Sequence, residues 1–85
     1  MFNVELGKPA QRFLRKCDHS IYTRLLERIK LLAHDPFPQD VKRVVGRKEK
    51  IFRIRVGDYR IQYAVFHEQN LILITDIDKR AHAYD

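Results

Sequence analysis

The chain has 85 residues, of which 45% are hydrophobic, and its formal net charge is +6. This length predicts a single domain spanning residues 1–85, and the apolar content excludes a disordered tail. The one cysteine, Cys17, excludes an internal disulfide bond and fits a reducing compartment. Because the chain has neither a basic, apolar leader nor a long apolar run, we expect a cytoplasmic protein that does not span a membrane.

The first half of the sequence predicts one strand followed by two helices. Residues 2–6 alternate apolar and polar side chains, which is typical of a half-buried strand. Pro9 fits an early position in a short helix that runs to about Cys17, because a missing N–H costs nothing there. A second helix runs to about His34, with apolar residues at the three-and-four spacing of an amphipathic helix. The prolines in residues 36–38 end the helical region.

The second half predicts three strands joined by short turns. Residues 51–56 and 59–66 alternate apolar and polar side chains, and residues 71–77 form a near-continuous apolar run. The polar stretch 39–50 predicts a loop, and a short strand near Val44 is an alternative within it. Consecutive strands with short turns form an antiparallel meander. We therefore expect an α+β fold of order βααβββ, in which two helices pack on one face of a single-layer sheet.

Basic residues are concentrated between positions 42 and 60. This segment has eight basic and two acidic residues, so it carries a charge of +6, while the rest of the chain balances to zero. A local surplus of this kind is typical of a surface that binds a polyanion, although composition alone also fits an ordinary solvated surface. The basic residues of the segment are Lys42, Arg43, Arg47, Lys48, Lys50, Arg53, Arg55 and Arg60.

The spacing of the two middle strands predicts a tight hairpin with a cluster of arginines. Only Gly57-Asp58 separates the strands, which favours a type II′ turn. That turn fixes the register, so Arg55 faces Arg60, and Arg53 lies on the same side of the sheet, away from the helices. Opposed like charges destabilise a hairpin, and a bound phosphate is the natural compensation for guanidinium groups. The alternative is a solvated arginine face that protects the open sheet from aggregation.

The end of the chain adds further candidate residues, since antiparallel pairing can return it toward the hairpin. A phenol and an imidazole beside cations can move the protons that strand scission by a ribose 2′-hydroxyl requires. The phenol of Tyr84 can alternatively stack on a base. The four histidines lack metal-ligand spacing and the three glycines form no phosphate-binding loop, so we expect neither a metal nor a cofactor. The candidate residues of the tail are Lys79, Arg80, His82 and Tyr84.

The sequence FRIRVGDYRIQY at residues 52–63 strongly resembles the central motif of the RelE/ParE toxins of toxin–antitoxin systems. The helical pattern before Pro36 and the ending at residues 79–84 are similar too, so the resemblance covers nearly the whole chain. It implies that Arg53 and Arg55 occupy positions that hold lysines in some RelE toxins. Because arginine stays protonated, it is a poor proton shuttle at those positions.

The resemblance also implies roles for single residues. Arg60 matches the hairpin arginine that stabilises the scissile phosphate, and Arg80 and Tyr84 match a C-terminal arginine and tyrosine of the family. Any proton-transfer role shifts toward Tyr84 or His82. The expected catalytic residues are Arg60, Arg80, His82 and Tyr84, and the expected phosphate-binding residues are Arg47, Lys48, Lys50, Arg53, Arg55 and Lys79.

By this resemblance we expect a RelE-like toxin that cleaves mRNA in the ribosomal A site without a metal ion. Its partners would be the ribosome, mRNA and a neutralising RelB-like antitoxin, with no membrane and no small-molecule cofactor. One alternative is a ParE-like toxin that inhibits DNA gyrase. A second alternative is a nucleic-acid-binding module without chemistry of its own.

Overall fold

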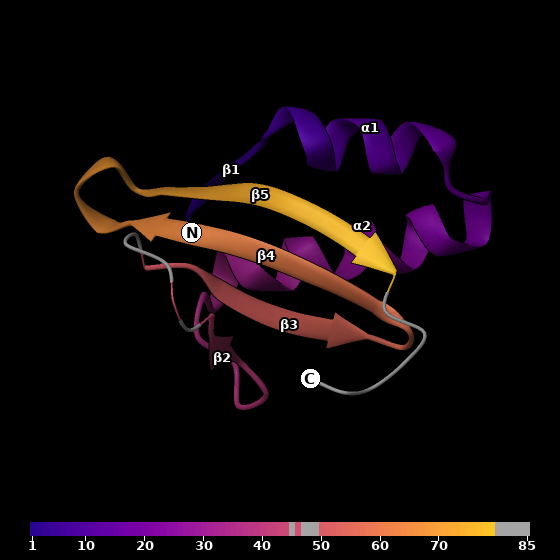
Figure 1. Cartoon of the computed structure of the whole chain (residues 1–85). Coiled ribbons are helices and arrows are strands. Elements are labelled where there is room, and N and C mark those ends of the chain that lie inside the picture. The colour runs from indigo at the N-terminus through magenta and orange to yellow at the C-terminus, as the bar shows by residue number, and fades with distance from the viewer. Residues whose placement is uncertain (45, 47–49, 80–85) are drawn as a thin grey trace.

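The computed structural model describes residues 1–44, 46 and 50–79 of the chain. Its sheet has the strand order β1-β5-β4-β3-β2, with β1 parallel to β5 and the other neighbours antiparallel (Figure 1). A short 3-10 turn, His67–Gln69, joins the last two strands. The elements are β1 (Asn3–Leu6), α1 (Lys8–Lys16), α2 (His19–His34), β2 (Lys42–Arg43), β3 (Phe52–Val56), β4 (Tyr59–Phe66) and β5 (Leu71–Lys79).

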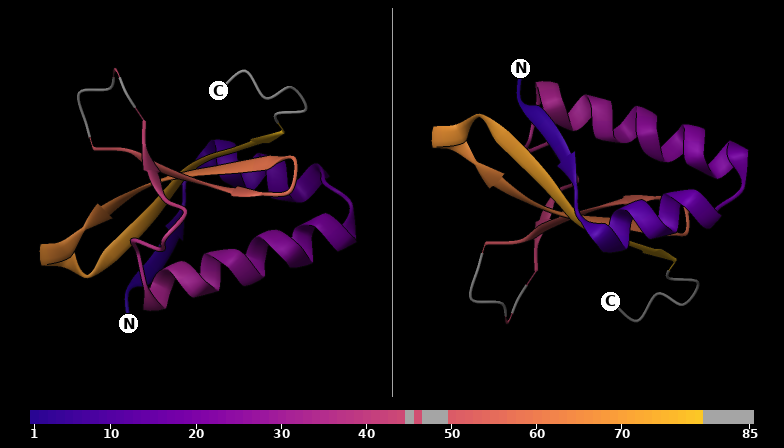
Figure 2. Two further views of the ribbon diagram at one scale, coloured as in Figure 1. Left: turned by 90° about the horizontal axis from the view of Figure 1, so that it is seen from below. Right: turned by 90° about the horizontal axis from the view of Figure 1, so that it is seen from above.

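The α+β class and the two-helix hairpin are confirmed. Pro9 lies in the first turn of α1, and the helix ends where Cys17 turns to an extended conformation and donates its N–H to Phe13. Helix α2 ends at His34, before the prolines. Both helices lie on one side of the sheet, α1 along β5 and α2 across β3 and β4 (Figures 1 and 2). No helix of the described residues is long and apolar enough to cross a membrane.

The core lies between this helical layer and the facing side of the sheet. Ile54, Ile61 and Ile74 are almost completely buried there and pack against Leu25 and Ile29 of α2. The residues between them along each strand point to the other side, which no helix covers; we call it the open face. The other members of the core cluster are Ala10, Leu14, Leu32, Tyr63, Ile72 and Ile77.

The predicted strand near Val44 is present two residues earlier. Strand β2, Lys42–Arg43, is a two-residue edge strand that pairs antiparallel with β3 and places Lys42 opposite Arg53. Both of its side chains are exposed. Charged side chains are common on edge strands, where they discourage pairing with other chains, and they hide the apolar alternation that identifies buried strands.

A β-bulge in β5 determines which of its side chains reach the open face. Ile74 pairs with Tyr63, but Asp76 pairs with Gln62, so Thr75 is the extra residue. Because one extra residue reverses the alternation, Ile77 returns to the helix-covered side after the bulge. The acidic residues that flank Ile77 therefore lie on the open face.

Candidate phosphate-binding site

The predicted register of the β3–β4 hairpin is confirmed. Arg55 faces Arg60, and Arg53 faces Gln62. A type II′ turn requires a positive φ at its first central residue only. Gly57 has a φ of 61°, and the φ of Asp58 is not positive. Because Ile54 and Ile61 are buried on the helical side, the arginines lie on the open face.

Lys42 adds a fourth cation to this surface, since β2 places it opposite Arg53. We call the four residues Lys42, Arg53, Arg55 and Arg60 the arginine face. A hollow of about 400 Å³ is lined by Asp40, Ile54 and three of these cations, Lys42, Arg53 and Arg55. The acid in the hollow already has a partner, because Arg28 of α2 donates to Asp40 at 2.5 Å. The hollow therefore presents mainly positive charge.

Arg60 is paired with an acid that we did not predict beside the arginines. Its Nε and Nη2 donate to the two carboxylate oxygens of Asp78 at 3.3 and 3.1 Å. The Arg60 side chain is only 13% exposed. Asp78 offsets part of the charge of the opposed arginines from β5, where the bulge turns it to the open face, so a bound phosphate is not the sole compensation for their repulsion. The spacing of apolar residues in β5 was the available signal, since it changes from two to three between Ile74 and Ile77.

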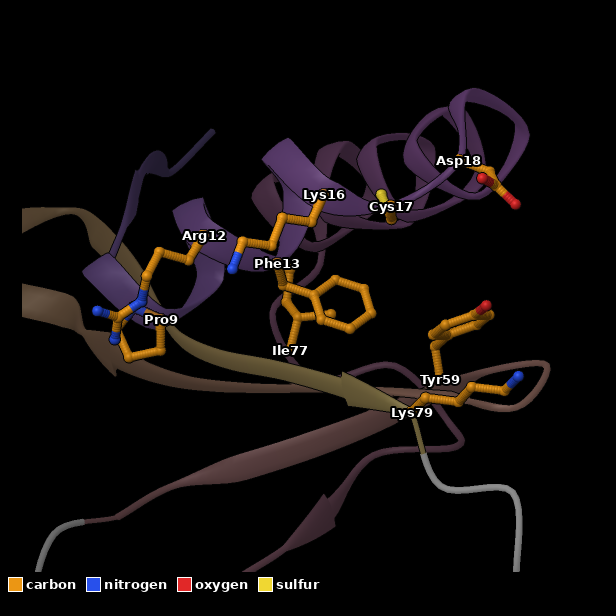
Figure 3. A pocket seen from close by; sticks show the side chains of 9 residues that line it. All are labelled: Pro9, Arg12, Phe13, Lys16, Cys17, Asp18, Tyr59, Ile77 and Lys79. Atoms are coloured by element: carbon orange, nitrogen blue, oxygen red, sulfur yellow. The ribbon is translucent and has the colours of Figure 1, made fainter.

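Lys79 lies on the other side of the sheet from the arginine face. It pairs with Tyr59 and lines a cavity of about 480 Å³ between α1 and the ends of β4 and β5 (Figure 3). The same bulge causes this, because it turns Ile77 and Lys79 together toward α1. The expected grouping of Lys79 with the hairpin arginines is therefore not found. The cavity, which we call the α1 pocket, is lined by Pro9, Arg12, Phe13, Lys16, Cys17, Asp18, Tyr59, Ile77 and Lys79.

The remaining predicted site residues are Lys50 and five residues that the structure does not describe. Lys50 is exposed and lies before β3, next to Ala64, Phe66 and Leu73 and away from the hairpin turn. Five further predicted site residues lie outside the described part of the chain. They are Arg47, Lys48, Arg80, His82 and Tyr84.

The contact of one further cation with the hairpin turn was not predicted. The guanidinium of Arg24, on α2, lies so close to Gly57 that a Cβ added there would be 2.7 Å from Nη2. The turn thus has both a positive φ and a close neighbour, and both favour glycine.

Among the residues that the structure describes, two groups have shifted pKa values, and neither lies on the arginine face. Burial raises the pKa of the Tyr63 phenol, which donates to the carbonyl of Pro36 at 2.6 Å within the core. Burial also raises the pKa of the Cys17 thiol in the α1 pocket, which makes it a poor nucleophile. Within the described ranges, no group of three or more histidine, cysteine or acidic side chains could hold a metal ion.

The described part of the site can bind an anion and offset negative charge. Guanidinium groups offer paired N–H donors in a plane, which match the oxygen atoms of a phosphate. Arg60 is anchored and largely buried, whereas Arg55 is exposed on the facing strand. The site therefore combines a largely buried cation with an exposed one.

Comparisons with known proteins agree with this fold. Residues 4–84 match a family model described as "ParE toxin of type II toxin-antitoxin system, parDE". A protein of Methanocaldococcus jannaschii with the curated name "Putative toxin RelE1" is 35% identical, over 98% of this chain and 94% of that protein.

Two solved complexes contain similar chains. The archaeal RelE–RelB complex from Pyrococcus horikoshii OT3 gives a TM-score of 0.82 and 29% identity, covering 96% of this chain and 98% of that chain. The toxin–antitoxin complex RelBE2 from Mycobacterium tuberculosis gives a TM-score of 0.78 and 26% identity, covering 93% of this chain and 98% of that chain.

Proposed function

The chain belongs to the RelE/ParE superfamily of toxins of type II toxin–antitoxin systems, and we propose that it is a RelE-like toxin that cleaves mRNA on the ribosome. The observation that carries this proposal is the arginine face. Four cations from three adjacent strands line one open surface, at the strand spacing of about 4.8 Å. Such a surface suits a chain of phosphates, and the related RelE1 protein is named a toxin.

In the proposed reaction, a ribose 2′-hydroxyl attacks the adjacent phosphorus and the 5′-oxygen of the next nucleotide leaves. The 2′-hydroxyl loses a proton to a base, and the leaving oxygen gains one from an acid. The products carry a 2′,3′-cyclic phosphate and a 5′-hydroxyl. Arg60 and Arg80 offset the charge that builds on the phosphate oxygens, and Arg53 and Arg55 bind the flanking backbone.

Proton transfer is assigned to Tyr84 and His82, both outside the described residues. A guanidinium group is a poor base, so in this proposal the arginines orient the substrate and offset its charge but do not transfer protons. Histidine titrates near neutral pH and a phenol beside cations ionises more readily than usual. No metal ion takes part in this proposal.

We also propose a RelB-like antitoxin as the partner that neutralises the toxin. The similar chains from P. horikoshii and M. tuberculosis were solved in toxin–antitoxin complexes. An antitoxin that covers the arginine face would block access of mRNA directly. Acidic side chains on its covering segment would complement the four cations.

A gyrase inhibitor is the second candidate, because the matching family model is described as a ParE toxin. The two candidates differ in whether the protein cleaves mRNA. In a reconstituted translation system with mapped mRNA ends, a RelE-like toxin cuts within codons and leaves cyclic or 2′/3′-phosphate ends. An uncut mRNA, together with inhibited supercoiling by gyrase, would replace the first candidate with the second.

The chemical assignment has its own test in the same system. Tyr84→Phe keeps the ring and removes the hydroxyl, so loss of a proton-transfer group should lower the cleavage rate by roughly 10²-fold with binding nearly unchanged. If Tyr84 only stacks on a base, Phe is tolerated and Ala is not. His82→Ala is the parallel variant, and wild-type rates for both would remove these residues from the reaction. Cleavage that stops with a zinc chelator, at constant Mg²⁺, would contradict a metal-free reaction.

A further inference from the structure

An ion pair between Asp78 of β5 and Arg60 of β4 holds one cation of the arginine face from a neighbouring strand. They are directly opposite in the β4–β5 register. The carboxylate engages the Nε and Nη2 of Arg60 through both of its oxygens, at 3.3 and 3.1 Å. Two parallel bonds fix the plane of a guanidinium, which one bond would leave free to rotate.

The pairing uses only one edge of the guanidinium. An arginine has five N–H donors, and the carboxylate takes the side edge formed by Nε and Nη2. The end edge, formed by Nη1 and the second hydrogen of Nη2, keeps a geometry that matches two phosphate oxygens. Arg60 can therefore bind Asp78 and a phosphate at the same time.

The burial of the two side chains supports a fixed arrangement. Arg60 is 13% exposed and Asp78 36% exposed, so the arginine has lost most of its water while the acid retains some. Without its carboxylate partner, a half-buried guanidinium would turn toward solvent to recover hydration.

From these observations we infer that Asp78 is a positioning residue that aims the end edge of Arg60 at the scissile phosphate. The inference rests on the proposed function of the arginine face. An acid beside a phosphate site weakens binding of the polyanion, because like charges repel. Asp78 therefore weakens substrate binding and increases turnover by orienting the cation that stabilises the transition state.

The chain offers a matched control for the charge effect. Asp76 lies on the same strand and on the same face, one step along the ladder, where it pairs with Gln62 rather than with an arginine. Asp78→Asn and Asp76→Asn each remove one negative charge and keep the side-chain shape. Only the first removes the carboxylate that holds Arg60.

The test compares both variants with the wild-type protein in two measurements. In ribosome-dependent cleavage, Asp78→Asn should lower kcat by about tenfold with an unchanged or lower KM, because a misoriented group loses rate and not affinity. Asp76→Asn should have the same effect on KM as Asp78→Asn, because both remove one negative charge, but it should keep kcat within about twofold of the wild-type value. In NMR spectra of the full-length toxin, the Arg60 Nε–H signal should exchange faster with water in Asp78→Asn only.

Equal kcat values for the two variants would mean that Asp78 acts only through its negative charge and does not orient Arg60, which would overturn the inference. An Arg60 Nε–H signal that is the same in Asp78→Asn and wild type would overturn it as well. Backbone spectra of both variants establish that they are folded. If the wild-type protein cleaves no mRNA, the proposed function fails, while the NMR comparison still decides whether Asp78 holds Arg60.

Discussion

Two basic surfaces lie on opposite sides of the same end of the sheet. On the open face, Arg55 and Arg60 come from paired strands and stand next to the carboxylate of Asp78. On the helical side, the α1 pocket collects Arg12 and Lys16 of α1 with Lys79 of β5 (Figure 3). The α1 pocket is lined by these three cations and by one acid, Asp18, so the second surface is positive as well.

The surfaces differ in what lies between their cations. The floor of the α1 pocket is apolar. The rings of Phe13 and Tyr59 pack edge to face with their centroids 5.8 Å apart, and Ile77 also lines the pocket. A phosphate over such a floor loses water without gaining hydrogen bonds. On the arginine face the groups between the cations are polar, including Gln62 and Asp78. Charge therefore locates candidate surfaces, while the groups around the charge decide which one suits RNA.

The largest expected difference between the surfaces is in cleavage. Arg60→Ala removes a cation of the arginine face and should lower the cleavage rate by about 10²-fold or more, because the charge on the scissile phosphate loses its partner. Lys79→Ala removes one charge from the α1 pocket and should change the rate by less than about twofold. Thermal melts should show little loss of stability for Lys79→Ala, because exposed charges contribute about 1 kcal/mol or less. The loss should be larger for Arg60→Ala, because that variant removes a largely buried side chain and its ion pair with Asp78. Similar rates for the two variants would break the comparison.

The hairpin turn provides the next effect. Gly57 has a φ of 61°, so Gly57→Ala should cost about 1 kcal/mol of folding free energy and displace Arg24. RNA affinity should also fall, because the turn sets the register of the arginines. Gly46→Ala is the control: its φ is 87° with nothing within 4 Å of an added Cβ, and it lies outside the hairpin. Denaturant titrations and RNA binding check both, and equal RNA affinity for the two variants would contradict the role of the turn.

Tyr63 tests the core on which both surfaces depend. Tyr63→Phe leaves the Pro36 carbonyl without its donor and should cost about 1–2 kcal/mol. Because the folded state raises the pKa of Tyr63, the unfolded state loses the proton first, and wild-type stability should decline as pH rises above about 10. The Phe variant should lack that part of the decline. Parallel pH slopes for the two proteins would contradict the buried hydrogen bond.

The smallest expected effect concerns Cys17 in the α1 pocket. Burial raises its pKa, so alkylation by iodoacetamide at pH 8 should be slower than for a free thiol. RNA bound to the arginine face should leave this rate unchanged within about twofold. Mass spectrometry with and without RNA measures it. Strong protection by RNA would mean that the nucleic acid also covers the α1 pocket.

Much of the fold follows from local chemistry. The two-residue turn sets the pairing of Arg55 with Arg60, and Pro9 and the prolines after His34 delimit the helices, so these features were predicted. Each depends on residues close together in the sequence. The parallel pairing of β1 with β5 joins the two ends of the chain, and no local pattern encodes it.

The composition of the site was predicted less completely, because it depends on which face of the sheet each side chain of β5 points to, and one extra residue reverses that alternation. One extra residue at Thr75 turns Asp78 to the open face and Lys79 away from it. A regular strand would have done the opposite, which is what grouping Lys79 with the arginines assumed. The net charge of zero outside residues 42–60 likewise concealed the positive charge of α1, because acidic residues elsewhere in the sequence offset its four basic residues.

Binding of RNA to the arginine face can be measured by an NMR titration with a short RNA in which 2′-O-methyl groups block cleavage. We expect the largest backbone amide shifts at residues 42, 53, 55 and 60 of the arginine face. Affinity should fall with salt, as expected for phosphate contacts. The amides of Arg12, Lys16 and Lys79 should shift little. Shifts concentrated on α1 and the end of β5, with the hairpin unchanged, would contradict the claim that the arginine face binds RNA.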